Sequence, residues 1–360
     1  MTASNHEEQR NEVKLTALRT AMAEAGAQAL LVSDPANIRY LSGFSSPDDG
    51  TVLVLPERAI LFTDSRYTAQ AAAESWLPVE IGSNTDNVIA ELVKDLRLGV
   101  ESDHLTLSRY RKLAGLTGSE PLALNPLLAK LRLLKSAAEI ELLREAARIT
   151  DVAYAAALGT LKAGVSEVEV ALELERVMRQ EGADGSGFDI IVASGERGAM
   201  PHGVASGKKI ENGDLVTMDF GANYRGYHAD MTRTVAVGEV SAEARRMFDA
   251  VLEAQIASLA AVAPGKRGSD IDGVARRILE DYGLGDAFVH SLGHGTGLEI
   301  HEDPRLSQRS DDVLAPGMIV TIEPGVYIPG FTGLRIEDLA VVTEDGHEVL
   351  SKSPKEFKQL

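Results

Sequence analysis

Hydrophobic and polar positions divide the chain into two regions with different periodicity. In the first region, short apolar runs rich in Val, Leu and Ile alternate with stretches of helical spacing, which is typical of a small α/β domain. The runs predict strands at 27–34, 50–55 and 58–64, and the helical stretches predict helices near 9–25, 66–75, 84–96 and 106–114. A long stretch of helical spacing, 136–162, then begins a different region. We therefore predict an N-terminal α/β domain at 1–130 and a second domain at 131–360.

The second domain contains an internal repeat. The segment GDLVTMDFG at 213–221 aligns without gaps with GMIVTIEPG at 317–325. A pair of helical segments precedes each, and the second helix of each pair has a serine N-cap signature, Ser166 with Glu169 and, more weakly, Ser269 with Asp272. The repeat predicts two helix–helix–hairpin halves that face one another across a pseudo-twofold axis, in an α+β fold with a ligand site between the halves.

The first repeat places two acids on one hairpin. The turn-forming cluster 223–226 is centred between Tyr224 and Arg225, and reflection through that centre puts Asp219 opposite Asp230. Facing residues have Cβ atoms about 4.5–5.5 Å apart, so two ionised carboxylates there would repel strongly. Something must therefore neutralise them.

The second repeat contains the same arrangement. Its turn cluster, 329–331, is centred on Gly330, and reflection through this residue puts Glu323 opposite Glu337. Any two residues have a midpoint, but here both midpoints fall on turn-forming residues. The two hairpins together therefore predict a cluster of four carboxylates.

A glycine-rich loop with three histidines lies between the hairpins. It runs HSLGHGTGLEIH from His290 through His294 to His301. Glycines beside His294 allow the backbone to approach a compact site closely, and they disfavour a helical zinc motif. Four carboxylates carry a charge of −4, which two divalent cations would balance. Such an oxygen-rich ligand set favours manganese or cobalt(II), with zinc as an alternative, and paired cations that share a water lower its pKa.

Composition and charge limit the cellular compartment and the partners that we expect for this protein. The formal net charge is −18 and no dense run of Lys and Arg occurs, which disfavours binding to nucleic acid. No apolar stretch approaches the roughly 18 residues of a membrane span, and the first residues lack the pattern of a secretory signal. There is no cysteine, so disulfides and thiolate ligands are excluded. We expect a cytoplasmic protein.

Several segments of the sequence resemble those of a known family. MDFGANYRGYHADMTRT, HSLGHGTGLEIHE, TIEPGVYIPG, GLRIED and FDIIVASGERGAMPHG are similar to the Xaa-Pro branch of the pita-bread metallopeptidases, which contains prolidase and aminopeptidase P. NIRYLSGF and LFTDSRY resemble the family's creatinase-like N-terminal domain. The resemblance covers essentially the whole chain. It implies hydrolysis of the Xaa-Pro bond in dipeptides and short peptides, and a homodimer.

The resemblance also implies roles for nine residues. Two metal ions, with manganese expected, would be bound by Asp219, Asp230, His294, Glu323 and Glu337. Glu323 would also carry a proton from the attacking water to the leaving nitrogen. His202 and His301 would contact the scissile carbonyl or the developing oxyanion, His290 would line the pocket beside proline, and Arg335 would orient a ligand carboxylate. Independently of the resemblance, the positions of Arg39 and Arg66 near turns make either one a candidate to reach the terminal carboxylate of a dipeptide.

Three alternatives remain open from the sequence. A methionine aminopeptidase has a similar metal set but normally lacks this N-terminal domain. A non-catalytic peptide-binding module on the same fold usually lacks ligands, whereas all five are present here. A creatine amidinohydrolase shares the fold without the metals. Prolidase and aminopeptidase P are not distinguished, and dipeptides are slightly favoured.

Overall fold

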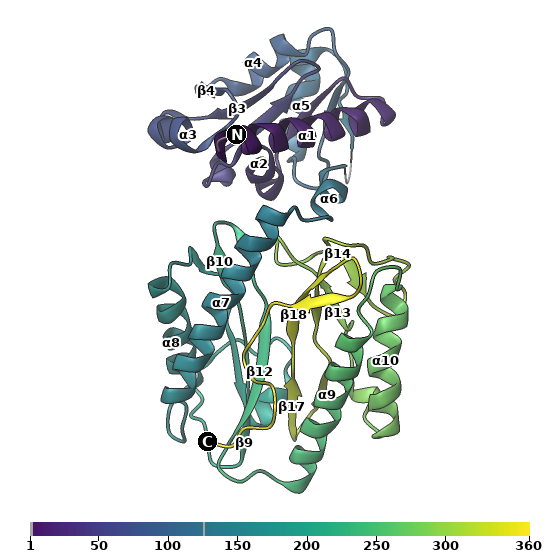
Figure 1. Cartoon of the computed structure of the whole chain (residues 1–360). Helices are drawn as coiled ribbons and strands as arrows, with labels where there is room; N and C mark the ends of the chain where they lie inside the picture. The colour runs from purple at the N-terminus through teal and green to yellow at the C-terminus, as the bar shows by residue number, and fades with distance from the viewer. Residues whose placement is uncertain (1–2, 125–126) are drawn as a thin grey trace. The chain divides into compact units, whose positions relative to one another are not determined.

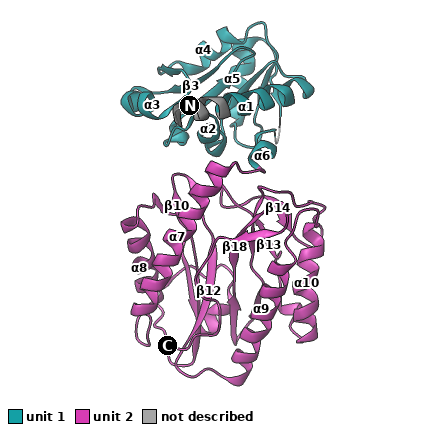
Figure 2. Ribbon diagram, in the orientation of Figure 1, with its two compact units in different colours: residues 1–132 teal, residues 133–360 magenta. Residues whose placement is uncertain are grey.

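The computed structural model describes residues 3–124 and 127–360, and the chain divides into two compact units, Met1–Arg132 and Leu133–Leu360 (Figure 2). The sequence placed the boundary at residue 130, which lies in α6, the helix at the end of unit 1. Across the described part of the chain, no helix combines the length and the apolarity needed to cross a lipid bilayer.

Unit 1 is a mixed sheet surrounded by helices. Its six strands have the order β4-β3-β2-β1-β5-β6. The strands are β1 (Ala29–Val32), β2 (Thr51–Val54), β3 (Ala59–Thr63), β4 (Val79–Ile81), β5 (Leu98–Val100) and β6 (Leu122–Ala123). The helices are α1 (Ala3–Glu24), α2 (Pro35–Ser42), α3 (Thr68–Glu74), α4 (Thr85–Leu92), α5 (Leu107–Thr117) and α6 (Leu127–Arg132), with short 3-10 turns η1 (Pro47–Asp49) and η2 (Ser65–Tyr67).

Helix α2 was not predicted, although its two ends are marked in the sequence. The Asp34 side chain caps it by accepting from the Ala36 N–H at 2.9 Å, Pro35 is its first residue, and Gly43 ends it in a left-handed conformation with φ of 76°. Proline at the first position and glycine after the last are strong helix-boundary signals. The two caps were therefore the usable signal for this helix.

Unit 2 consists of two halves, each with two helices packed on its own strands. The helices are α7 (Ala137–Thr160), α8 (Glu167–Gln180), α9 (Ala242–Ala260) and α10 (Gly268–Asp281), with 3-10 turns η3 (Gly195–Ala199) and η4 (Gly285–Ala287). Figure 1 shows α7 and α8 on one side of the strands and α9 and α10 on the other. One apolar core contains Leu174, Met218 and Phe220, and a second contains Phe248, Ile322 and Leu334. The predicted two-half architecture is confirmed.

The strands of the first half are β7 (Gly185–Ser186), β8 (Ile191–Ser194), β9 (Asp214–Phe220), β10 (Ala222–Tyr224), β11 (Tyr227–His228) and β12 (Met231–Val237). Those of the second are β13 (Gly293–Gly295), β14 (Glu302–Leu306), β15 (Ile319–Ile322), β16 (Gly325–Ile328), β17 (Thr332–Arg335), β18 (Asp338–Val342) and β19 (His347–Val349). Strands β9 and β12 pair in the first half, whereas β15 pairs with β18 and β16 with β17 in the second.

The two predicted serine caps had different outcomes. Ser166 caps α8 in a complete capping box with Glu169, as expected. The prediction for Ser269 was wrong, because α10 already begins at Gly268 and no side chain caps it. The Asp272 carboxylate instead accepts from the Arg276 Nε at 2.6 Å and from the Leu292 N–H at 3.1 Å. The Asp272 carboxylate therefore bonds one residue of its own helix and one residue of the segment before β13, and it does not cap the helix.

The predicted register of the first hairpin was also wrong, by two residues. Asp219 faces Thr232 rather than Asp230, and Tyr224 faces Tyr227. The turn is therefore centred between Arg225 and Gly226, which both have positive φ, 50° and 81°. Two positive φ values are the mark of a tight type I′ hairpin turn. This backbone requirement, rather than the centre of the polar cluster, sets the register.

In this register Asp230 stands opposite Gly221. A Cβ atom on Gly221 would lie 1.7 Å from the Ala229 carbonyl oxygen, so only glycine fits. Asp219 and Asp230 remain on the same face, because positions two apart on a strand share a face. They are diagonal neighbours, within reach of a shared ligand.

The second hairpin follows the predicted register. Ile322 pairs with Asp338 and Gly325 with Arg335, so Glu323 and Glu337 occupy facing positions between these pairs. The turn contains Gly330 with φ of 76°.

Candidate metal centre

The nine residues to which the family resemblance assigned roles line one cavity in unit 2. Its volume is about 470 Å³. It contains Asp219, Asp230, His294, Glu323 and Glu337 together with His202, His290, His301 and Arg335. Residues from distant parts of the chain are therefore brought to one surface, and both halves contribute to it.

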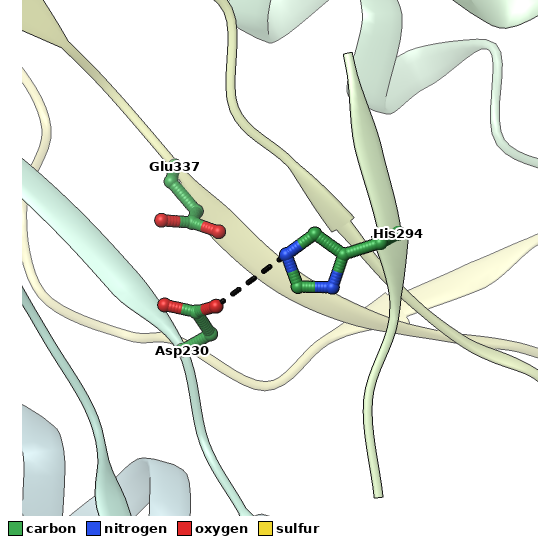
Figure 3. A group of neighbouring side chains, drawn as sticks. All are labelled: Asp230, His294 and Glu337. Atoms are coloured by element: carbon green, nitrogen blue, oxygen red, sulfur yellow. Dashed lines mark ion pairs between the residues drawn. The ribbon is translucent and has the colours of Figure 1, made fainter. Parts of the chain in front are cut away.

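Three of these residues form a tight group. Ligand atoms of Asp230, His294 and Glu337 all lie within 4.8 Å of one another, and all three side chains are buried. Asp230 immediately precedes β12, Glu337 immediately precedes β18, and His294 lies on β13. Figure 3 shows the two carboxylates and the imidazole pointing toward one another, with 3.7 Å between His294 Nε2 and Asp230 Oδ2.

Three buried carboxylate oxygens in this cavity have no hydrogen-bond partner. They are Asp219 Oδ1, Asp230 Oδ1 and Glu337 Oε1. A buried carboxylate oxygen without a partner is strongly unfavourable, because the charge has lost its water shell. The structure therefore leaves acceptor atoms for which a cation is the fitting partner.

The imidazole of His294 has the orientation of a metal ligand. Its Nδ1 lies 2.9 Å from the Gly295 carbonyl oxygen, and this contact assigns the ring proton to Nδ1. Burial lowers the pKa of His294 to about 3, so the ring is neutral and the lone pair of Nε2 faces the carboxylates. Nε2 lies 3.3 Å from Glu323 Oε1. Both atoms are hydrogen-bond acceptors, so neither can donate to the other. A cation between such atoms removes the conflict.

Glycines on both sides of His294 permit this placement, as the sequence indicated. A Cβ on Gly293 would lie 2.0 Å from the Thr321 carbonyl oxygen, and one on Gly295 would lie 2.2 Å from that of Asp303. The segment is a strand and not a helix.

The carboxylates of the cluster are difficult to ionise together. Burial and the nearby charge of Glu337 raise the pKa of Asp230 well above its ordinary value. Burial and the charge of Glu323 do the same to the pKa of Glu337. Burial also raises the pKa of Glu323 to about 7. A cation bound among these groups would offset both causes, so the shifts are those expected of a cation-binding cluster.

Arg335 supports the cluster from one side. Its Nη2 bonds Asp219, its Nε donates to Thr232 Oγ1 at 3.0 Å, and its Nη1 donates to Tyr327 Oη at 2.6 Å. Thr232 Oγ1 in turn donates to Glu337 Oε2 at 2.7 Å. Arg335 therefore orients the Asp219 carboxylate, and its role toward a bound metal stays a prediction.

The three further histidines surround the carboxylate cluster. His301 packs edge-on against His294 with ring centroids 4.5 Å apart, and burial lowers its pKa. His290 donates from Nδ1 to the Ser291 carbonyl oxygen at 2.7 Å, so its Nε2 accepts from Tyr327 Oη at 3.0 Å. Burial lowers the pKa of His290 to about 4. His202 lies on the loop after β8 and is exposed at the cavity.

Sequence reasoning missed the hydroxyl groups that hold the ligands, although strand periodicity marks two of them. Thr232 lies two residues after Asp230, and Thr321 lies two residues before Glu323. Residues two apart share a strand face. Thr321 Oγ1 donates to Glu323 Oε1 at 3.2 Å and accepts from the His294 N–H at 3.0 Å. Tyr327 had no comparable signal.

Arg305 was missed as well. It faces His294 across β13 and β14 and lines the cavity, where its side chain is 47% exposed. The arginines suggested from the sequence, Arg39 and Arg66, lie on α2 and η2 of unit 1, and their role stays a prediction. Arg66 is already paired with Asp49 and Asp64, both at 2.7 Å.

Comparison with known proteins identifies the family of this chain. Residues 141–344 match the model of metallopeptidase family M24, and residues 14–134 match the creatinase/prolidase N-terminal domain. The chain is 39% identical to the Xaa-Pro dipeptidase of Pyrococcus furiosus, over 96% of this chain and 99% of that protein.

Solved structures show the same similarity. The Xaa-Pro dipeptidase from Bacillus anthracis superposes with a TM-score of 0.94 at 45% identity, covering 97% of this chain and 100% of that one. An X-Pro aminopeptidase from Thermotoga maritima superposes with a TM-score of 0.87 at 38% identity, covering 93% and 98%. The chain therefore belongs to metallopeptidase family M24, with the two-domain, α+β pita-bread fold and a creatinase/prolidase N-terminal domain.

Proposed function

We propose that this peptidase is a metal-dependent prolidase that hydrolyses the Xaa-Pro bond of dipeptides. One observation carries the proposal: three unpartnered, buried carboxylate oxygens share one cavity with a neutral imidazole, three further histidines and two arginines. The names of the similar proteins supply the substrate class, since two of them are Xaa-Pro dipeptidases.

We infer that two divalent cations would be held by Asp219, Asp230, His294, Glu323 and Glu337. When bound, they would polarise the scissile carbonyl and lower the pKa of the attacking water. Carboxylate oxygens dominate the set, which favours manganese, with cobalt(II) and zinc as alternatives. Thr232, Thr321 and Arg335 hold individual carboxylate oxygens in place by hydrogen bonds, so the ligands are oriented before any ion arrives.

The remaining steps belong to side chains of the cavity. Glu323 would take a proton from the attacking water as the carbon–oxygen bond forms, and would deliver it to the proline nitrogen as the carbon–nitrogen bond breaks. His202 and His301 would donate hydrogen bonds to the carbonyl oxygen as its negative charge develops. His290, whose Nε2 is already bonded to Tyr327, would serve as a wall beside the proline ring.

Arg305 supports a preference for dipeptides. A substrate with proline at its C-terminus carries a carboxylate close to the scissile bond. Arg335 donates from all three of its nitrogens to protein atoms, whereas Arg305 is half exposed at the cavity, with Asp303 at 3.9 Å. We propose Arg305 as the cation that receives the substrate carboxylate, because guanidinium groups bind carboxylates well.

The decisive test is hydrolysis of Ala-Pro, Ala-Pro-Ala and a longer Xaa-Pro peptide, each with manganese, cobalt and zinc and with a chelator. We expect manganese-dependent cleavage of Ala-Pro, slower cleavage of the longer peptides, and loss of activity with the chelator. Absence of Ala-Pro cleavage with all three metals would contradict the proposal. Faster cleavage of the longer peptides would assign aminopeptidase P activity instead.

A methionine aminopeptidase is the second candidate, because it uses a similar set of ligands. Met-Ala as substrate separates the two activities. Cleavage of Met-Ala but not of Ala-Pro would favour it.

We also propose a homodimer in the cytoplasm. Light scattering on the purified protein tests the first part and cell fractionation tests the second.

A further inference from the structure

The four cavity histidines lie outside the two hairpins that carry the carboxylates, and two of them lie on connecting segments that a buried carboxylate fastens to a helix. His202 lies on the loop 195–205, and His290 lies on the segment 288–292. Loops are generally more mobile than the elements they connect, yet a group that contacts a reacting atom must be held closely. Each of these two loops is fastened to a helix through one fully buried carboxylate, Glu167 for the first and Asp272 for the second.

Glu167 ties together both ends of loop 195–205. Its Oε1 accepts from the Ser194 N–H at 2.8 Å and from Ser194 Oγ at 2.9 Å, just before the loop. Its Oε2 accepts from the Ser206 N–H at 3.1 Å and from Ser206 Oγ at 2.6 Å, just after the loop. The exposed fraction of Glu167 is 0%. The Glu167 side chain thus holds the two ends of loop 195–205 together.

The interior of the loop is fixed by the same charge. Arg197 Nη1 forms an ion pair with Glu167 Oε2, and Arg197 Nη2 donates to the Val204 carbonyl oxygen at 2.9 Å. Val204 and His202 both line the cavity, and the Val204 N–H bonds the His202 carbonyl oxygen at 2.8 Å. The path from Glu167 to His202 therefore consists of consecutive hydrogen bonds.

Asp272 does the corresponding work in the second half. It lies on α10, is fully buried, and accepts from the Leu292 N–H and from Arg276 Nε. Arg276 Nη2 donates to the His290 carbonyl oxygen at 2.7 Å and its Nη1 to that of Phe288 at 3.3 Å. The Phe288 ring packs edge-on against His290, with centroids 5.1 Å apart.

We propose that Glu167 and Asp272 are positioning residues of the peptidase, which act through their arginines to hold His202 and His290 at the substrate. The inference rests on the proposed function. In each half of unit 2, a buried carboxylate and an arginine connect the second helix to a loop that carries a histidine. The same arrangement therefore occurs twice in the duplicated core. Replacing one partner of a buried charge pair by a neutral residue leaves the other charge buried without a counter-charge. Neutral replacements in either pair are therefore expected to be unfavourable.

The test uses Glu167→Gln and Asp272→Asn in the full-length, metal-loaded enzyme. An amide nitrogen cannot accept the hydrogen bonds that the lost oxygen accepted. Because His202 is placed at the carbonyl and His290 beside proline, we expect the two variants to differ. Glu167→Gln should lower kcat about tenfold to a hundredfold with little change in KM, and Asp272→Asn should raise KM by a similar factor. Metal content should stay unchanged in both.

Double-mutant cycles separate positioning from general destabilisation. In a His202→Ala background, Glu167→Gln should lower kcat by less than about threefold. In a His290→Ala background, Asp272→Asn should raise KM by less than about threefold. Asp86→Asn is the matched control, because it breaks a partly buried pair with Arg109 and Lys112 in unit 1 and should leave kcat and KM unchanged. Additive effects in the cycles would overturn the inference.

An imidazole NMR spectrum of the zinc-loaded protein, in which no paramagnetic ion broadens the signals, supplies a readout that does not depend on activity. The His202 signal should shift or broaden in Glu167→Gln alone, and the His290 signal in Asp272→Asn alone. If either variant fails to fold, Ser206→Ala and Arg276→Lys remove one connection each. Unchanged histidine signals would overturn the inference even if the wild type fails to cleave Ala-Pro. Absence of that cleavage by itself counts against the proposed function only.

Discussion

At the scale of single residues, the unpartnered oxygens of Asp230 and Glu337 are the part of the site most sensitive to chemical change. Asp230→Asn keeps the size of the side chain but removes one negative charge from the candidate cluster. We expect metal content to fall and Ala-Pro hydrolysis to drop on the order of 10³-fold or more, because several kcal/mol of charge stabilisation are lost. Elemental analysis and a rate assay measure both.

The control for this change is Asp311→Asn, whose side chain is 93% exposed and pairs with Arg267. Asp311→Asn should keep the metal content and the Ala-Pro hydrolysis rate of the wild type. A fully active, metal-replete Asp230→Asn enzyme would show that this carboxylate is not a ligand.

Arg305 gives a second prediction at this scale. Arg305→Ala should raise KM for Ala-Pro by about 10- to 100-fold, since a hydrogen bond between charged groups contributes about 1.5–3 kcal/mol. The substrate control is Ala-prolinamide, which lacks the carboxylate and should be cleaved by variant and wild type alike. An equal loss on both substrates would assign Arg305 a role other than binding the carboxylate.

Residue identities were the part of the site that sequence revealed best. Nine of the side chains named from the sequence line the cavity, whereas Arg39 and Arg66 lie in unit 1. Acids at matching places in two repeated hairpins and histidines among glycines indicated seven of the nine, and the family resemblance alone indicated His202 and Arg335. Thr232, Thr321 and Tyr327 were missed because a hydroxyl group becomes informative only once its partner is known. Arg305 was missed because its pairing partner across the sheet, His294, is set by a bulged register.

At the scale of elements, the first hairpin shows why register is harder to predict than pairing. The polar cluster at 223–226 identified the turn, but the two positive φ angles at Arg225 and Gly226 decided its centre. Reflection through the wrong centre still placed both aspartates on one face, because a shift of two residues preserves the face. The error therefore left the predicted carboxylate cluster intact.

Gly221 tests the close backbone approach in this hairpin. Gly221→Ala should destabilise the fold by on the order of 3 kcal/mol or more, because a Cβ would meet the Ala229 backbone. Gly159→Ala is the matched control, since Gly159 lies near the end of α7 with open space around its Cβ position. It should stabilise the protein by about 0.4–1 kcal/mol. Urea unfolding compares the two, and equal effects would contradict this account.

The capping box of α8 predicts a pH dependence. Hydrogen bonds from Ser166 and the charge of Lys209 lower the pKa of Glu169 from 4.5 to about 2. A depressed carboxyl pKa stabilises the folded state above the unfolded value and loses that effect as the pH falls toward the folded value. The free energy of unfolding of Glu169→Gln should therefore fall less than that of wild type between about pH 5 and pH 3. Glu120→Gln, on an exposed loop, should follow the wild type, and parallel curves for Glu169→Gln would count against the cap.

At the scale of the whole molecule, the cavity lies entirely within unit 2. Bound metal should therefore stabilise that unit selectively. In calorimetry, manganese at about 100 times its dissociation constant should add about 2.7 kcal/mol to the unfolding free energy of unit 2, and a chelator should remove it. The transition of unit 1 should stay in place. A shift of both transitions by equal amounts would show that the units unfold together.

The two-half plan of unit 2 followed from the sequence because a repeat of nine aligned residues is itself a sign of duplication. Details that depend on contacts between distant residues did not follow. Ser269 resembled a helix cap, yet α10 begins at Gly268, where a Cβ atom would lie 2.3 Å from the Arg305 carbonyl oxygen. The local pattern contains no signal for this close approach to a residue distant in the sequence.

The two halves are also bonded to each other across the cavity. Arg335 from the second half holds Asp219 from the first, and Thr232 from the first holds Glu337 from the second. A single repeat would thus contain half of the acids and lack the group that orients Asp219 or Glu337, so two copies of it would have to associate to form the site. Joining both repeats in one polypeptide makes their encounter unimolecular, so assembly of this centre does not depend on how dilute the protein is.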